Sequence, residues 1–131
     1  MNVSNYLAKA LLNETFRGIE YVKPDTVYMA LYTSNPTAAD TGREVTGGAY
    51  ARQTLTFAAP TVESGRQTIK NSADIQFPVA TADWGTVTHM GIRDAATGGN
   101  LLYYGPLDSP RSILTNDRFK MLANSAVLTL S

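Results

Sequence analysis

Apolar residues near the N-terminus recur with the spacing of an α-helix. The stripe consists of Leu7, Leu11, Leu12 and Phe16. Ser4 is a suitable N-cap, because its hydroxyl can accept a hydrogen bond from an amide of the first turn. Gly18 suits the left-handed position that ends many helices. The pattern predicts a helix over about residues 4–17, which either caps or packs on one side of a sheet or contacts a neighbouring subunit; we favour the first.

From residue 26 onward the apolar positions alternate, which is the period of a β-strand. The stretch 26–33 is the clearest case, with Pro24 before it and Pro36 after it. Its two faces are Val27, Met29 and Leu31 on one side, and Tyr28, Ala30 and Tyr32 on the other. We expect the first face to lie in the core, and the tyrosines to bury their rings while keeping their hydroxyls in water.

Further short runs of the same kind follow, separated by glycine, proline and asparagine. They cover residues 50–57, 74–79, 86–94, 101–104, 112–114, 119–122 and 126–130. Within 86–94, alternation places Val87 and His89 on the face opposite Met90 and Ile92. Gly105 and the proline after it should end the run 101–104. The last two runs should pair with each other as a hairpin.

This organisation predicts a mainly β chain. About seven or eight short strands at intervals near 8–12 residues are typical of an antiparallel sandwich or barrel. We therefore expect a single antiparallel β-sandwich or barrel-like domain over residues 1–131, with one N-terminal α-helix and a β-rich body over about 26–131. Its expected core includes Val27, Met29, Leu31, Leu55, Phe57, Ile75, Phe77 and Ile92.

Two polar segments are candidates for contacts with a partner. Thr37–Ala49 holds three glycines and few large apolar groups, and loops of this length in a compact domain are usually functional or mobile. Residues 61–72 are polar with Glu63–Arg66 at their centre, which suggests the tip of a hairpin. The N-terminal residues are a third candidate contact segment.

Charge and cysteine content narrow the function classes. Eleven basic and eleven acidic residues give a net charge of zero, which argues against a nucleic-acid binder. Chains near neutrality also associate easily. The absence of cysteine excludes disulfides and thiolate metal sites. The N-terminus does not read as a signal peptide and no apolar run is long enough to span a bilayer, so we expect no membrane partner.

Catalytic patterns are missing. The sequence contains no nucleophile elbow, no phosphate-binding loop and no paired metal-binding histidines. His89 is the single histidine and lies in the middle of a predicted strand, where a structural role is the ordinary one. The aspartates lie near turns without a distinctive spacing. We expect no enzyme, no cofactor and no metal, although a small hydrolase using His89 or an aspartate pair stays open as a third hypothesis.

Trp84, the single tryptophan, allows two interpretations. Beside Tyr103 or Tyr104 it could stack on a sugar ring, as in a carbohydrate-binding β-sandwich used for host attachment. The alternative is packing in the core or at the end of the sheet, which is the commoner role of such rings. We favour packing and keep the carbohydrate-binding module as the alternative function.

Long stretches of the chain resemble a family of small structural proteins of tailed-bacteriophage virions, commonly labelled phage tail fibre proteins. These stretches are Asn2–Leu7, Val27–Thr37, Gly47–Gln53, Asn71–Ile92 and Asp94–Gly105. The resemblance implies a virion protein that binds other virion proteins, either as a decoration or cement on the capsid or as part of the tail. It implies major capsid or tail proteins as partners, assembly in the host bacterial cytoplasm, and a homo-oligomer, with a trimer expected.

Tyrosines and charged residues in or near loops are the candidate interface residues. Tyrosine and arginine are enriched at protein interfaces, and the arginine fork pairs well with carboxylates. The candidates are Tyr6, Arg43, Glu44, Glu63, Arg66 and Arg111.

Overall fold

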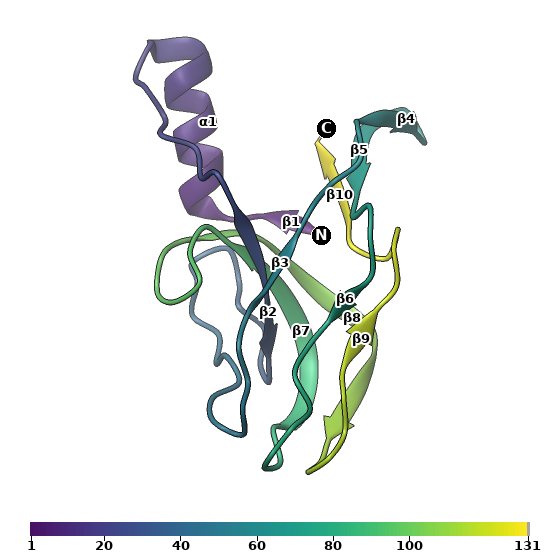
Figure 1. Ribbon diagram of the computed structural model, residues 1–131. Helices are drawn as coiled ribbons and strands as arrows, with labels where there is room; N and C mark the ends of the chain where they lie inside the picture. The colour runs from purple at the N-terminus through teal and green to yellow at the C-terminus, as the bar shows by residue number, and fades with distance from the viewer. Residues whose placement is uncertain (131) are drawn as a thin grey trace.

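Alternating apolar residues build the main sheet, in a chain that is mainly β with antiparallel sheets and one helix near the N-terminus, as predicted (Figure 1). The computed structural model describes residues 1–130. The main sheet has five strands in the order β1-β8-β7-β2-β3. Their bounds are β1 Asn2–Val3, β2 Val27–Tyr32, β3 Gln53–Leu55, β7 Gly85–Arg93 and β8 Leu101–Ile113.

Two smaller sheets complete the body. One has three strands in the order β10-β5-β4 and is called the small sheet below; the other is a ribbon of β6 and β9. Their bounds are β4 Thr61–Glu63, β5 Arg66–Lys70, β6 Ile75–Gln76, β9 Lys120–Met121 and β10 Val127–Leu130. The predicted hairpin tip around Glu63–Arg66 is confirmed as the β4–β5 turn. Ser64 and Gly65 both have positive φ there, at 52° and 76°, as a tight two-residue hairpin turn requires.

The core lies between the main sheet and the β6–β9 ribbon. Its centre is aromatic: the Phe77 ring lies 6.2 Å from Tyr50, 6.5 Å from Trp84 and 5.7 Å from Phe119, measured between centroids. Six of the eight predicted core residues are buried, and Val27 and Phe57 pack against this core while staying partly exposed. On the other face of β2, Tyr32 is fully buried. Its hydroxyl is therefore not in water, contrary to the expectation.

The side chains of β7 do not alternate strictly between the two faces of the sheet. The pairing with β8 shifts register between Val87 and His89, which marks a β-bulge. The surplus residues lie on β8, and Val87 is buried in the same core as Met90 and Ile92. The prediction that Val87 lies opposite Met90 is therefore wrong.

The strand starting at Leu101 does not end at Gly105. β8 continues to Ile113 and passes through Pro106 and Pro110. β1 pairs only with Tyr103 and Tyr104 of β8. The later half of β8 is therefore an edge on that side, where a proline removes no hydrogen bond between strands. The register also skips from Pro106 to Arg111 against β7, which leaves residues 107–110 as a local bulge.

The expected C-terminal hairpin is wrong as well. β9 pairs with β6, whereas β10 pairs with β5. The fully buried Asn71 explains the separation: its side-chain oxygen accepts from the Ala126 amide at 2.8 Å, and its Nδ2 donates to the Leu122 carbonyl at 3.1 Å. The Asn124 amide donates to the Asn71 carbonyl at 2.9 Å. These bonds hold the turn between the two strands and direct them to different partners.

Candidate interaction surfaces

Helix α1 (Asn5–Arg17) is fixed to the body at its first turn. The Ser4 hydroxyl accepts from the Leu7 amide at 3.1 Å, which confirms the predicted N-cap, and the Ser4 amide donates to the Leu102 carbonyl at 2.8 Å. The Asn5 amide donates to the Ala38 carbonyl at 2.9 Å. Gly18 ends the helix with φ 67°, as predicted.

Beyond its first turn α1 stands away from the sheets (Figure 1). None of its residues is buried; Leu7 packs against the core, while Leu12 is 60% and Phe16 78% exposed. The helix therefore meets the main sheet at β8 through its first turn and does not lie along the sheet. The alternative role, contact with a neighbouring subunit, stays a prediction.

The chain returns from α1 toward β2 along one side of the helix. The rings of Tyr6 and Tyr21 meet edge to face with centroids 6.4 Å apart. This return leaves a hollow of about 360 Å³ beside α1, and it leaves Ile19 and Val22 exposed. The segment after α1 thus adds exposed apolar surface beside the helix.

A second apolar surface lies beside the small sheet. Its groove of about 200 Å³ is lined by Pro60, Gln67, Thr68, Ile69, Tyr103, Leu128, Thr129 and Leu130, none of them charged. Register places Val62 opposite Gln67, and Gln67 opposite Leu130, so the three share one face. Val62 is 64% and Leu130 59% exposed. The charged residues Glu63, Arg66 and Lys70 fall on the other face by the same alternation.

The loop between β2 and β3, predicted as a contact segment, is held by a first ion pair. Arg93 donates to both carboxylate oxygens of Asp40, at 2.8 and 2.9 Å, and to the Tyr32 hydroxyl at 3.0 Å. It also donates to the carbonyls of Gly98 and Gly99. One buried guanidinium therefore joins this loop to the turn between β7 and β8.

A second ion pair holds the later part of the same loop. Arg52 contacts both oxygens of Glu44 at 2.8 Å, and the Tyr50 hydroxyl donates to Glu44 at 2.6 Å. Arg52 also donates to the carbonyls of Ala95 and Gly98. Val45 is buried, so the loop between β2 and β3 packs as part of the body and does not extend as a free arm.

The Glu44 site is electrostatically stabilised. Burial raises the pKa of Glu44, but hydrogen bonds from Arg52 and Tyr50 outweigh it, so the pKa lies below its usual value of 4.5. Burial and the bond to Glu44 raise the pKa of Tyr50, which keeps its hydroxyl protonated as a donor.

We expect this site to make folding stability pH-dependent. A depressed folded-state pKa contributes stability that is present above the unfolded value and is lost as pH falls through the folded value. Glu44→Gln should therefore reduce the loss of unfolding free energy between about pH 5 and about pH 2, measured by urea denaturation. Glu14→Gln, which removes an exposed carboxylate of α1, should keep the wild-type slope. Equal slopes for wild type and Glu44→Gln would contradict the assignment.

The predicted interface residues lie in four places. Tyr6 is exposed on α1, and Arg43 is exposed in the loop after β2. Glu63 and Arg66 are exposed and face each other across the β4–β5 turn. Arg111 is exposed on β8. Glu44 differs from them, because its carboxylate is bound within the chain by Arg52 and Tyr50.

Hydrophobic periodicity alone does not tell which apolar residues are exposed, because it marks an apolar face without showing what covers it. Leu12 and Phe16 belong to the helix stripe for which contact with a neighbouring subunit was the alternative, whereas Val62 and Leu130 were absent from the predicted interface. Their exposure depends on how α1 and the small sheet are mounted on the body.

Trp84 is buried, with 5% of its surface exposed. Its Nε1 donates to the Gly48 carbonyl at 2.9 Å, and its ring meets Tyr50 edge to face at 5.4 Å. The ring face that stacking on a sugar requires is therefore covered, and the packing interpretation is the correct one. Burial lowers the pKa of His89, whose Nδ1 lies 2.8 Å from the Thr88 hydroxyl.

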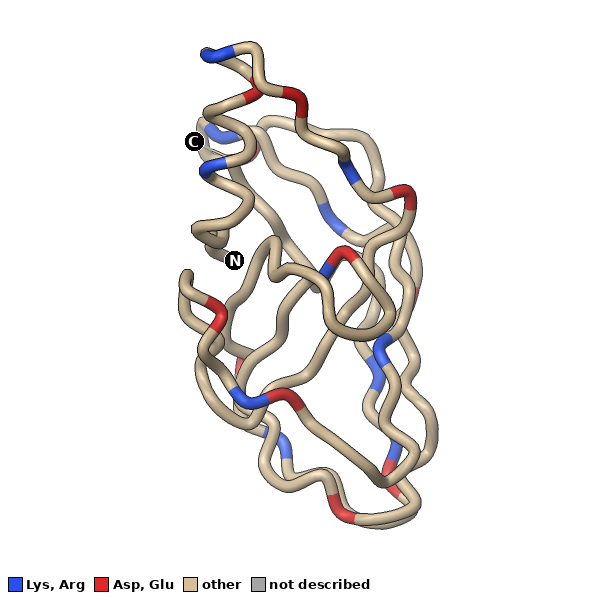
Figure 2. Tube along the Cα trace, turned by 90° about the vertical axis from the view of Figure 1, so that its left-hand side faces the viewer, with Lys and Arg blue, Asp and Glu red and all other residues tan. Residues whose placement is uncertain are grey.

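Three further features of residues 1–130 concern metal ions, membranes and the distribution of charge. These residues contain no cluster of three histidine, aspartate or glutamate side chains that could hold a metal ion. Within the same part of the chain, no helix has the length and apolar character needed to cross a bilayer. Positive and negative residues are interspersed along the molecule rather than gathered by sign (Figure 2).

Comparison with known proteins identifies a family. A family model described as "Podophage GP4 fiber I protein gp80" matches residues 2–129. No curated protein matches the chain.

Proposed function

This chain belongs to the podophage GP4 fiber I protein family, and from that premise we propose that it works by binding other virion proteins rather than by catalysis. Membership makes it a phage fibre structural protein associated with the virion. The proposed mechanism is physical: a protein that binds only the assembled particle stabilises it, and repeated weak contacts add up.

The observation that carries this proposal is the exposure of α1. Leu12 and Phe16 lie four residues apart on one face of a helix that touches the body only at its first turn. A helix of about 12–15 residues is marginally stable in water by itself. A partner that covers this face would bury two large apolar side chains and would stabilise the helix at the same time.

The rest of the surface is suited to binding a partner protein rather than to catalysing a reaction. The loop between β2 and β3 is held in one shape by the ion pairs of Arg52 and Arg93, which lowers the entropy cost of binding. The chain could occupy either a capsid site or a tail site in the particle. Cryo-electron microscopy of particles with this chain labelled distinguishes the two.

Incorporation into particles tests the proposal. Phage lacking the protein is complemented with Leu12→Gln/Phe16→Gln, and copies per purified particle are counted by mass spectrometry. We expect about a tenfold loss or more, since tenfold corresponds to only about 1.4 kcal/mol of contact energy.

The control replaces an equally exposed leucine elsewhere. Leu122 is 62% exposed in the turn after β9, and Leu122→Gln should be incorporated like wild type. Normal incorporation of the α1 variant, with a wild-type melting temperature, would exclude α1 as the binding element.

A further inference from the structure

The direction in which α1 leaves the body depends on few contacts, and they lie at its base. The base bonds to two segments that are far apart in the sequence. The Ser4 amide donates to the Leu102 carbonyl of β8 at 2.8 Å, and the Asn5 amide donates to the Ala38 carbonyl at 2.9 Å. Ala38 belongs to the loop between β2 and β3. One of the two anchors of the helix is therefore a loop.

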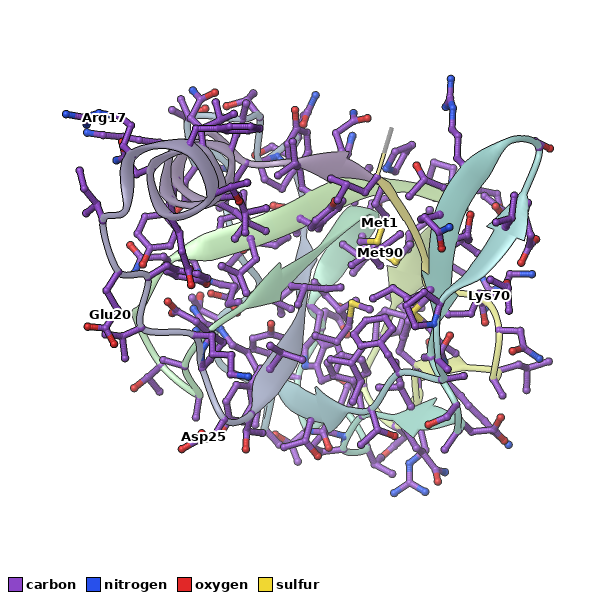
Figure 3. All side chains as sticks on the ribbon, turned by 90° about the horizontal axis from the view of Figure 1, so that it is seen from above. Met1, Arg17, Glu20, Asp25, Lys70 and Met90 are labelled. Atoms are coloured by element: carbon purple, nitrogen blue, oxygen red, sulfur yellow. The ribbon has the colours of Figure 1, made fainter. Side chains whose placement is uncertain are left out.

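A small change at the base becomes a large one at the exposed face of the helix. α1 has 13 residues and rises about 1.5 Å for each, so its free end lies about 20 Å from its base. A tilt of about 10° at the base moves that end by roughly 3 Å. Figure 3 looks down on this end of the molecule and shows α1 nearly end-on, with Arg17 pointing away from the sheets. None of the helix residues is buried, so contacts further along α1 do little to correct a tilt.

The loop anchor lies in a strained part of the backbone. Ala38 is flanked by two residues in the left-handed region, Thr37 with φ 60° and Asp40 with φ 59°. This conformation is costly for a β-branched residue such as threonine, and it persists only where surrounding contacts impose it. The direction of the Ala38 carbonyl, and with it the bond to Asn5, therefore depends on what holds residues 36–42 in place.

These residues are held on both sides of Ala38. Pro36, before it, is buried. Asp40, after it, accepts from Arg93 at 2.8 and 2.9 Å. Arg93 is 7% exposed at the end of β7 and also donates to the Tyr32 hydroxyl, so its guanidinium is fixed to the main sheet. A continuous line of contacts thus runs from the main sheet through Asp40 and Ala38 to the base of α1.

We propose that Arg93 and Asp40 are the positioning residues of the α1 binding face: their ion pair fixes residues 36–42, and these fix the angle at which the helix leaves the body. The inference rests on the proposed function and adds that the face is presented at one angle. A helix held at its bound angle binds more tightly than one that samples several, because only the molecules with the correct angle bind.

Two spin labels measure this angle, and they attach only where cysteines are introduced because the chain has none. Thr15→Cys labels the exposed outer half of α1, and Thr86→Cys labels an exposed position of β7. Double electron–electron resonance gives the distribution of distances between the labels. Asp40→Gly removes both acceptor oxygens, while glycine adopts the positive φ readily. It should broaden or shift the distribution by roughly 3 Å, as a tilt of about 10° predicts.

Glu44→Gln is the matched control. It weakens the other ion pair of the same loop, in which Arg52 contacts both oxygens of Glu44 and two carbonyls of the turn after β7 but not α1. The control should keep the wild-type distribution. Asp40→Asn keeps one acceptor oxygen and a residue type that tolerates positive φ, so it should show a smaller change in the same direction. This milder variant carries the test if Asp40→Gly does not fold.

The consequence for binding is measured in particles. Phage lacking the protein is complemented with Asp40→Gly, and copies per purified particle are counted by mass spectrometry. We expect a loss of about threefold to tenfold, which corresponds to about a third to a tenth of the molecules holding α1 at the bound angle.

Three results would overturn the proposal. An unchanged label distance in Asp40→Gly would mean that α1 keeps its direction without the ion pair, whatever happens to the melting temperature. Equal broadening in Glu44→Gln would mean that any loosening of the loop moves the helix. Broadening together with wild-type incorporation would mean that the angle does not limit binding. Failure of the proposed function gives a different result: Leu12→Gln/Phe16→Gln then enters particles normally, while the label distances still respond to Asp40→Gly.

Discussion

Replacing Phe77 by alanine is expected to lower the free energy of unfolding by about 3–5 kcal/mol, the largest effect of any single substitution considered for this chain. Phe77 is 1% exposed and lies among Tyr50, Trp84 and Phe119. The change removes apolar burial and leaves a cavity where three rings meet. It should lower Tm by roughly 10–20 °C for a chain of this size.

The matched control is another phenylalanine. Phe16 is 78% exposed, so Phe16→Ala should change stability by about 0.5 kcal/mol or less, as surface substitutions do. Both variants are compared by thermal melts and urea denaturation. Similar losses for the two would show that the aromatic cluster around Phe77 is not the centre of the core.

Local signals in the sequence were enough to predict some elements. The helix begins after Ser4 and ends before Gly18, because both cap positions depend on residues within one turn. The β4–β5 hairpin follows from Ser64-Gly65, where positive φ is needed at both positions. The alternating run 27–32 likewise formed a strand, although burial on both faces exceeded what alternation implies.

Other elements depend on contacts between distant residues. Asn71 decides which strands β9 and β10 join, yet it lies 55 residues before Ala126, whose amide it binds. The bulge that turns Val87 inward comes from its pairing with β8 and leaves no mark in the alternation. Asn71 reads as an ordinary turn residue until its partners are known.

The candidate interaction surfaces show the same difference between features that local sequence determines and features that depend on distant contacts. Composition and loop position correctly placed Arg43, Glu63 and Arg66 on the surface. They could not separate these from Glu44, whose partner Arg52 lies eight residues away in an irregular loop. The exposure of Leu12 and Phe16 could be raised only as an alternative, because periodicity reports which residues share a face, while exposure depends on how all the elements are assembled.

The ion pair of Arg93 is the second large effect that we expect. Arg93→Met should cost about 3 kcal/mol, because it removes a buried guanidinium that donates to several acceptors, and each buried acceptor left without its donor costs about 1–3 kcal/mol. Asp40 would lose both of its hydrogen bonds from Arg93, and the Tyr32 hydroxyl and the Gly98 and Gly99 carbonyls would lose a donor. Asp40 is exposed, so its carboxylate regains water and accounts for only part of this loss.

Two further variants separate the ion pair from other effects of Arg93→Met. Arg118 is exposed, so Arg118→Met should stay within about 0.5 kcal/mol of wild type. Asp40→Asn added to Arg93→Met removes the uncompensated carboxylate and should recover part of the loss, which identifies the coupling between the two residues. Urea denaturation gives the free energies, and hydrogen exchange of residues 36–42 should rise in Arg93→Met. Equal stability of Arg93→Met and Arg118→Met would mean that the loop keeps its shape without this ion pair, and that the preformed surface has another cause.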